Sequence, residues 1–309
     1  MIVDPTVTYS YSQMLRDILG LKTEYSKLIK VKNAGYSSEG RQLPVIILGS
    51  GEMKVFLCGT HHAREYITSA YLMYTIDTFA RAAKEGNKFG KYDIKKLLSK
   101  CTLHVLPMVN PDGTRLVQGG LRAVQNPEKV ASMKMVMPTY PQWKANVDGV
   151  DLNRQYPALW EKKNVVVDEP ASELFNGYNA ASEPEVKTVM DYCRKNPFHV
   201  SVSFHTKGEV IYWADTNTKR SIPSARSFAE RVAGVCGYEL MPTSQDPGIY
   251  AAGFENWFRQ EFLKPGLLVE LTPSLGGTMP HNDKHFYSLV WDKAKYICAE
   301  TMQSAIELD

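Results

Sequence analysis

The sequence predicts an α/β fold in which helices cover a β-sheet, and three observations lead to this prediction. Short apolar runs of strand length alternate with segments of helical periodicity along most of the chain. Clusters of Gly, Pro and Asn separate these segments, without an internal repeat or a low-complexity linker. The 309 residues are 44% hydrophobic and 22% charged, which is ordinary for a globular protein that buries a sizeable core. Strands that alternate with helices favour a sheet with helices on both faces.

The N-terminal half predicts three strands and one helix. Leu43–Leu48 and Val55–Cys58 are apolar runs separated by Gly-Ser-Gly, which indicates two neighbouring strands. Apolar residues recur with helical spacing over Arg64–Ala83. Thr102–Val109 is a further strand, and the Asn-Pro-Asp-Gly sequence after it is a strong turn signal.

Residues 113–180 are rich in Pro, Gly, Asn and Lys and show weak periodicity, so we expect a long loop region. Ser182-Glu-Pro-Glu185 then resembles a helix start, with Ser182 as the N-cap and Glu185 three residues later. This helix is expected to run to about Lys195.

The C-terminal part continues the alternation of strands and helices. We expect strands at Phe198–Phe204, Glu209–Ala214 and Gly266–Leu271, and helices at Ser224–Cys236 and Asp283–Met302. Ligands in such folds gather at the carboxyl ends of the strands, so residues just past a strand are the first candidates for a functional site.

Composition excludes several classes of protein. The formal net charge is +3, so no strong field of either sign is present, which excludes a strongly basic nucleic-acid binder and an acidic disordered tail. The five cysteines are scattered without a CxxC pair, which predicts buried free thiols in a reducing compartment. No secretory signal and no apolar run of membrane-spanning length is visible. A cytoplasmic, monomeric protein is the default expectation, and a secreted mature form stays open.

A candidate metal site begins directly after the second predicted strand. His62 and Glu65 are three residues apart at the expected start of a helix, a spacing that places both side chains on one side. His205 lies at the end of another predicted strand and supplies a third ligand, and two His with one Glu form a known catalytic zinc set. His61 is the main rival of His62, whereas His104, in the middle of an apolar run, favours a core position.

Three further segments add charged or mobile groups. Asn153 and Arg154 place an amide beside a guanidinium that suits a substrate carboxylate, although a surface turn explains them equally well. Tyr250 lies in a glycine-containing segment, where it either covers a site or packs in the core. Glu270 lies within an apolar strand, and a desolvated carboxylate of this kind is suited to act as a general base.

These segments together resemble the zinc metallocarboxypeptidase family typified by pancreatic carboxypeptidase A. The resemblance rests on His62-Ala-Arg-Glu65, Gly149-Val-Asp-Leu-Asn-Arg154, Ser203-Phe-His205 and Val269-Glu-Leu271 in this order, and it covers nearly the whole chain. It implies a single α/β catalytic domain over residues 1–309 with a mixed, mostly eight-stranded twisted sheet and helices on both faces. No pro-domain and no LysM-like wall-binding repeat is expected.

The resemblance also implies the role of each metal-site residue. His62, Glu65 and His205 would bind one zinc ion, with a water molecule in the open position. Glu270 would take a proton from that water and pass it to the leaving amine. Asp151 occupies the place of a carboxylate that orients one zinc histidine.

The substrate-binding residues follow from the same resemblance. Asn153 and Arg154 would hold the terminal carboxylate, Tyr250 would close over the bound residue, and Arg64 would contact the substrate upstream of the cleaved bond. Lys144, after Trp143, stands where the family usually has the arginine that stabilises the oxyanion, and a lysine is a point charge rather than a planar fork.

One residue, Glu255, bears on the specificity for the substrate side chain. Glu255 falls where the family sets side-chain preference, so it either favours a cationic side chain or is a solvated loop residue. The family often has a cis peptide directly after the strand of the general base, so the resemblance predicts a cis bond at Thr272–Pro273.

The predicted function is zinc-dependent hydrolysis of a peptide bond, or a γ-D-glutamyl isopeptide bond, next to a residue with a free carboxylate. The surroundings of Trp143 and Gln155 are similar to the bacterial γ-D-glutamyl-L-diamino acid peptidases, so the substrate is either a peptidoglycan stem peptide (a muropeptide) or a protein with a basic C-terminal residue. A small-molecule deacylase that uses the same zinc ligands is the alternative. A non-catalytic binding module would be expected to lose Glu270 or a ligand, and this sequence retains them.

Overall fold

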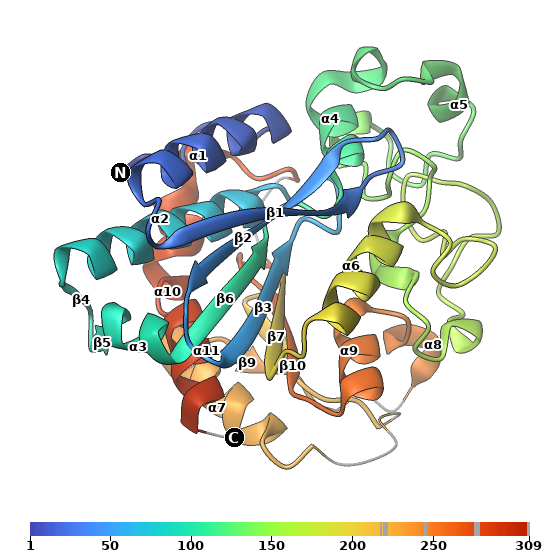
Figure 1. The fold of residues 1–309 in the computed structure, drawn as a ribbon. Helices are drawn as coiled ribbons and strands as arrows, with labels where there is room; N and C mark the ends of the chain where they lie inside the picture. Colours follow the sequence, from blue (N-terminus) through green and yellow to red (C-terminus); the bar gives the residue numbers. More distant parts are fainter. Residues whose placement is uncertain (217, 219–221, 244–245, 275–278, 308–309) are drawn as a thin grey trace.

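An eight-stranded mixed sheet crosses the computed structural model, which describes residues 1–216, 218, 222–243, 246–274 and 279–307 (Figure 1). The strand order is β1-β2-β6-β3-β7-β10-β8-β9. The strands of this sheet are β1 Ile29–Tyr36, β2 Gln42–Gly49, β3 Met53–Gly59, β6 Cys101–Leu106, β7 Val200–His205, β8 Val210–Tyr212, β9 Glu239–Leu240 and β10 Gly266–Glu270. A separate ribbon pairs β4 Lys88–Phe89 with β5 Tyr92–Asp93.

The centre of the sheet is parallel, and this decides where functional side chains meet. Strands β6, β3, β7 and β10 run parallel, whereas β1, β2 and β8 pair in antiparallel fashion at the two sides. In the register, Glu270 of β10 lies beside His205 of β7, and Phe204 lies beside Gly59 at the end of β3. The carboxyl ends of three adjacent strands therefore end at the same level of the sheet.

Helices cover both faces of the sheet, which confirms the predicted fold class (Figure 1). The α-helices are α1 Tyr11–Glu24, α2 Ile67–Glu85, α3 Ile94–Lys100, α4 Pro111–Gly119, α5 Pro127–Ala131, α6 Pro184–Lys195, α7 Ala225–Cys236, α8 Pro247–Tyr250, α9 Phe254–Phe262, α10 Asp292–Ala294 and α11 Ile297–Glu307. Val55 and Leu57 of β3 face the core shared with α1, α2, α7 and α11, while Phe56 and Cys58 face the core shared with α6 and α9. This alternation is the period of two that a strand imposes on its side chains.

Element boundaries differ from the sequence prediction at several places. Helix α2 begins at Ile67 and not at Arg64, because residues 61–65 form a separate turn in which the Glu65 amide donates to the His62 carbonyl oxygen over 3.0 Å. The N-cap of α6 is Glu183 and not Ser182, since Pro184 suits the first helical position. The predicted closing helix is broken into short 3₁₀, π and α turns before α11. Helices α1 and α9 and strand β1 were not predicted.

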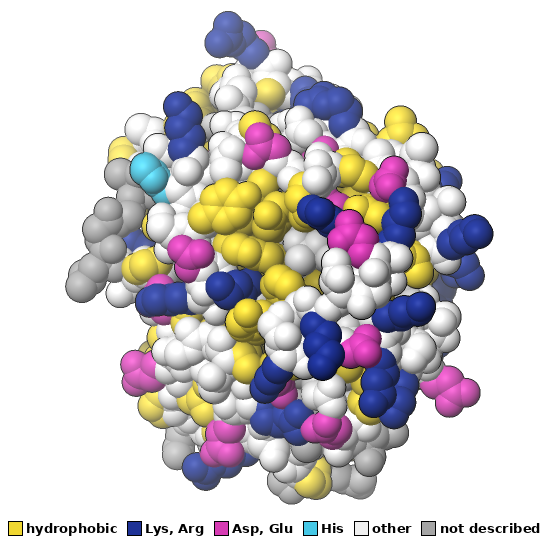
Figure 2. All heavy atoms as spheres, turned by 90° about the vertical axis from the view of Figure 1, so that its left-hand side faces the viewer, with side chains coloured by type: hydrophobic (Ala, Val, Ile, Leu, Met, Phe, Trp, Pro, Cys, Tyr) yellow, Lys and Arg dark blue, Asp and Glu magenta, His cyan; other side chains and the backbone are white. Residues whose placement is uncertain are grey.

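Figure 2 shows the face on the left of Figure 1, where hydrophobic side chains gather near the centre and charged side chains surround them. Tyr74 of α2 packs against Trp291 with ring centroids 4.6 Å apart, and together with Met1 and Phe89 they line a hollow of about 280 Å³. The aromatic contacts join α2 to the C-terminal part of the chain. Within the described ranges, none of the helices is long and apolar enough to cross a membrane.

Asn110 holds together two loops at the carboxyl end of the sheet, and the Asn-Pro-Asp-Gly sequence predicted as a turn is the start of helix α4. Asn110 is buried and is the N-cap of α4, where its side-chain oxygen accepts from the Gly113 amide over 3.0 Å. Its side-chain amide donates to the carbonyl oxygens of His61 and Ala145, each over 3.1 Å. One side chain thus connects the loop after β3 to the loop that contains Lys144.

We expect Asn110→Ala to lower the free energy of unfolding by about 2–4 kcal/mol, because three buried polar groups lose their partner. Asn126 is the matched control, since it is also an N-cap followed by proline but is exposed and accepts one bond, from the Lys129 amide. Asn126→Ala should cost about 1 kcal/mol. Equilibrium urea denaturation of both variants tests this, and equal losses would contradict the connecting role of Asn110.

Candidate metal centre and active site

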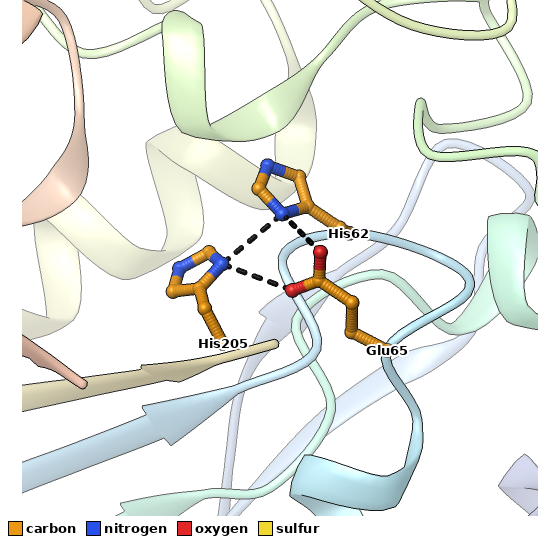
Figure 3. Close-up of side chains that lie close together, drawn as sticks. All are labelled: His62, Glu65 and His205. Carbon is orange, nitrogen blue, oxygen red and sulfur yellow. Dashed lines mark hydrogen bonds and ion pairs between the residues drawn. The ribbon is translucent and has the colours of Figure 1, made fainter. Parts of the chain in front are cut away.

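His62, Glu65 and His205 converge at the carboxyl end of the sheet (Figure 3). His62 and Glu65 come from the turn after β3, and His205 is the last residue of β7. His62 Nδ1 lies 2.9 Å from Glu65 Oε1 and 3.0 Å from His205 Nδ1, and His205 Nδ1 lies 3.1 Å from Glu65 Oε2. All three side chains are buried.

Each histidine is oriented through its other ring nitrogen. His62 Nε2 lies 3.1 Å from Asp151 Oδ1, and His205 Nε2 lies 3.0 Å from Ser203 Oγ. If both Nε2 atoms carry the proton, both Nδ1 atoms are left as lone-pair donors that face Glu65. This is the arrangement by which proteins hold metal-binding imidazoles in one tautomer and orientation.

The three donors fit a zinc ion. Zn–N and Zn–O bonds of about 2.0–2.1 Å in a tetrahedral site place neighbouring donors roughly 3.3 Å apart. The donor atoms here are separated by 2.9–3.1 Å and form one face of such a tetrahedron, which leaves a fourth position. Two nitrogens, one carboxylate and an open position are the donor set of a hydrolytic zinc site.

The pKa shifts of Glu65 and His62 favour a bound cation, whereas the shift of His205 opposes one. Burial by itself raises the pKa of the Glu65 carboxyl, but His62 and the hydrogen bonds from both histidines outweigh burial and hold this pKa well below its usual range. Burial lowers the pKa of His62, which favours the neutral imidazole that a metal needs. For His205, the hydrogen bond with Glu65 outweighs burial and raises the pKa.

Glu270 is the last residue of β10 and lies beside His205 in the sheet. Its Oε2 atom is buried and has no hydrogen-bond partner among the described residues. Burial raises the pKa of Glu270 to about 8, and the nearby Glu65 carboxylate adds to this rise. A cation bound at the triad lowers this pKa again, because an opposite charge favours the carboxylate form. Glu270 is therefore placed and tuned as a proton acceptor near neutral pH.

A cavity of about 210 Å³ opens above the triad. Of the residues named in the sequence analysis, those lining it are His62, His205, Glu270, Lys144, Asn153, Arg154, Tyr250 and Glu255. The structure thus brings together side chains that are more than two hundred positions apart in the chain. Tyr250 lies at the end of the short helix α8 and is 39% exposed, so its ring stands at the mouth of this cavity.

The cations of the cavity are organised around Asp151. Arg154 forms an ion pair and hydrogen bond with Asp151, and Lys144 Nζ lies 3.8 Å from Asp151 Oδ2. Asn153 lines the cavity and accepts a hydrogen bond from the Phe254 amide over 2.9 Å through its side-chain oxygen, which leaves its NH₂ group as a donor. Arg154, Asn153 and Lys144 together form a positive and hydrogen-bonding wall that suits a carboxylate or a developing oxyanion.

Glu255 is a buried carboxylate in this cavity and is not a solvated loop residue. It lies in the first turn of α9, and its carboxylate lies close to Gly253, where an added Cβ would approach Oε1 to 2.5 Å. Gly253 therefore makes room for the Glu255 side chain. The Oε2 atom has no hydrogen-bond partner within the described part of the chain.

Arg64 is placed differently from the other predicted substrate-binding residues. It donates to the Gln142 carbonyl oxygen over 2.7 Å and forms an ion pair with Glu173 at 3.1 Å. It does not line the cavity, because these two contacts direct its guanidinium toward the loop of residues 142–173.

The other histidines lie outside the metal triad. His61 is buried, and its Nε2 lies 2.9 Å from the Tyr156 hydroxyl. His104 is a core residue as predicted and contacts the Tyr192 hydroxyl over 2.7 Å. His281 is buried, and its Nε2 lies 2.9 Å from the Thr272 hydroxyl.

The predicted cis bond at Thr272–Pro273 is wrong, since this bond is trans. Among the described residues, the cis bonds are Thr206–Lys207 and Met279–Pro280. The chain turns directly after β7, beside the site. There the Gly208 amide donates to the Thr272 carbonyl oxygen over 2.6 Å.

Lys163 lines the same cavity and was missed by the sequence analysis. It lies in Glu161-Lys-Lys163 within the long loop region, and a charged run of this kind indicates a solvated surface. No signal in the local sequence distinguishes Lys163 from the exposed Lys162 beside it.

Comparisons with known proteins identify the family. A model of the zinc carboxypeptidase family matches residues 14–253. The chain is 31% identical to the γ-D-glutamyl-L-diamino acid endopeptidase 1 of Lysinibacillus sphaericus over 274 residues, which cover 87% of this chain and 67% of that protein. It is 25% identical to carboxypeptidase B of Astacus astacus over 302 residues, which cover 91% and 92% of the two chains.

Solved structures have the same fold. Thrombin-activatable fibrinolysis inhibitor superposes with a TM-score of 0.76 at 17% identity, over 99% of this chain and 78% of that chain. Carboxypeptidase A from Helicoverpa armigera superposes with a TM-score of 0.75 at 19% identity, over 98% of this chain and 75% of that chain. The protein belongs to the zinc carboxypeptidase family, peptidase family M14, and is a hydrolase of the metallopeptidase class.

We expect the purified protein to bind one zinc ion per chain and to lose it as the pH falls from 7.5 to 5.5. Protons compete with the metal for both imidazoles, and the raised pKa of His205 means that this competition begins above the ordinary histidine range of about 6.5. Elemental analysis and chelator competition at each pH measure the stoichiometry and the affinity.

His205→Ala should weaken zinc binding by at least about 100-fold, since one of three ligands is lost. His285→Ala is the matched control, because His285 is exposed and lies outside the triad. An unchanged affinity in His205→Ala would exclude the triad as the metal site.

Proposed function

We propose that the protein is a zinc metallopeptidase that cleaves a γ-D-glutamyl isopeptide bond next to a diamino acid with a free carboxylate, as found in peptidoglycan stem peptides. The observation that carries the proposal is that one cavity is lined by His62 and His205 of the metal triad together with Glu270 and Arg154. The similarity to the Lysinibacillus sphaericus endopeptidase supports the diamino acid substrate.

Each residue has a defined task in this reaction. Arg154 and Asn153 bind the free carboxylate and so place the scissile bond beside the triad. His62, Glu65 and His205 would hold a zinc ion, which would polarise the scissile carbonyl and make an attacking water more acidic. Glu270 accepts the proton of this water and later donates it to the leaving amine.

The remaining cavity residues stabilise charge and exclude water. Lys144 faces the cavity 3.8 Å from Asp151 and supplies a positive charge for the oxyanion that develops on the carbonyl oxygen. Tyr250, on the exposed end of α8, closes over the bound residue. Asp151 holds the His62 ring and the Arg154 guanidinium in place at the same time.

A carboxypeptidase that prefers basic C-terminal residues is the second candidate. The buried Glu255 carboxylate and the similarity to carboxypeptidase B favour it. The two candidates share the catalytic groups and differ in the bond that is cleaved, so a substrate panel separates them.

The zinc-loaded protein is incubated with L-Ala-γ-D-Glu-meso-diaminopimelate, with α-linked peptides ending in Lys or Phe, and with N-acetylated amino acids, and the products are identified by mass spectrometry. Release of diaminopimelate supports the proposal. Release of Lys alone supports the basic carboxypeptidase, and cleavage of the acylated amino acids alone supports a deacylase.

We expect Glu270→Gln to reduce kcat by at least about 10³-fold, because the amide cannot accept the proton. Zinc content should stay at the wild-type level, since Glu270 is outside the metal triad. Glu239→Gln in β9, an exposed strand residue, is the control and should keep wild-type kcat. Near wild-type turnover in Glu270→Gln would exclude its role as general base.

A further inference from the structure

The cavity contains two charged groups of opposite sign that the reaction itself does not use, Glu255 and Lys163. Glu255 is 7% exposed, and its buried Oε2 atom lacks a hydrogen-bond partner within the described residues. A buried carboxylate oxygen without a partner is costly, so its place in a substrate cavity points to a ligand group that donates to it.

Lys163 is held in the cavity by the segment that carries Tyr250. Its ammonium donates to the Ile249 carbonyl oxygen, and the amides of the next two residues, Asn164 and Val165, donate to the Gly248 carbonyl oxygen over 3.1 and 3.4 Å. The Asn164 side chain also packs closely on Gly248, where an added Cβ would approach it to 2.4 Å. The loop of Lys163 and helix α8 therefore form one wall of the cavity.

The ammonium of Lys163 is available to an anionic ligand. A lysine has three N–H donors, and in the described part of the chain one of them is paired, with Ile249. No ion pair joins Lys163 to a carboxylate among the described residues, although Arg154 is paired with Asp151. Burial lowers the pKa of Lys163 to about 8, and the Arg154 charge adds to this fall, so a bound carboxylate would raise this pKa again and further favour the ammonium form.

We propose that Glu255 and Lys163 together recognise a substrate side chain that itself ends in an amino-acid group, with its ammonium on Glu255 and its carboxylate on Lys163. The inference rests on the proposed function and deepens it. Arg154 and Asn153 bind the main-chain carboxylate of the substrate. A second cation, separate from Arg154, is needed only if the substrate side chain also carries a carboxylate. meso-Diaminopimelate has this end group, whereas lysine has the ammonium alone.

The test compares two substrates that differ only in the side-chain carboxylate, L-Ala-γ-D-Glu-meso-diaminopimelate and L-Ala-γ-D-Glu-L-Lys. We expect wild-type kcat/KM to favour the diaminopimelate substrate by a factor on the order of 10–100, the range expected for a charge-assisted hydrogen bond in a cavity. In Lys163→Met this ratio should fall to about one, because the methionine keeps the length of the side chain and loses the charge.

Lys162→Met is the matched control, since Lys162 is the exposed neighbour outside the cavity, and its ratio should equal that of the wild type. Glu255→Gln should lower kcat/KM for both substrates by a similar factor, because both carry the side-chain ammonium. Lys163→Arg should retain part of the preference.

The possible outcomes distinguish a failure of the proposed function from a failure of the inference about Glu255 and Lys163. Cleavage of neither substrate by the wild type overturns the proposed function and this inference with it. If the wild type cleaves both substrates with a kcat/KM ratio near one, the inference is overturned and the proposed function stands. This outcome is measured on the wild-type protein, without any variant. An equal fall of kcat/KM for both substrates in Lys163→Met also overturns it, because it would show that Lys163 supports the main-chain carboxylate or the Tyr250 segment.

Discussion

The site depends on one buried anion, Asp151. Its carboxylate is fully buried and contacts His62 Nε2 through one oxygen, while the other oxygen pairs with Arg154 and lies 3.8 Å from Lys144. Burial raises the pKa of an isolated carboxyl, but Arg154 and Lys144 outweigh burial here and hold the pKa of Asp151 well below its usual range. A metal ligand and two cations of the cavity are therefore positioned by the same charge, and each of them in turn keeps that charge ionised.

The second constraint is the register of the parallel strands. Parallel neighbours end at the same edge of a sheet, so residues that follow different strands are brought side by side without any local sequence signal between them. Glu270 lies beside His205 for this reason, and the turn after β3 adds His62 and Glu65. Asn110 fixes that turn to the loop of Lys144 through two hydrogen bonds to backbone carbonyl oxygens.

The charges that bear on substrate binding are individual side chains of the cavity and not the net charge of the protein. The net charge of +3 excludes a strong overall field but carries no information about the substrate. The cavity, by contrast, is lined by the cations Lys144, Arg154 and Lys163 and by the carboxylates Glu255 and Glu270. A ligand with several charged groups can pair with several of these side chains at once. A ligand with one charge pairs with only one of them and is therefore distinguished from the first.

The sequence by itself determined the alternation of strands and helices, because apolar periodicity is a local property. It named His62, Glu65 and His205 through the family resemblance, since their positions after strands alone left His61 as a rival of His62. It also singled out Glu270, since a carboxylate inside an apolar run is unusual at any position. Only the tertiary structure decided that Arg64 turns away to Glu173, that Glu255 is buried, and that Lys163 reaches the cavity. These placements depend on partners far along the chain, such as Ile249 for Lys163, and a long loop has no periodicity from which such contacts follow.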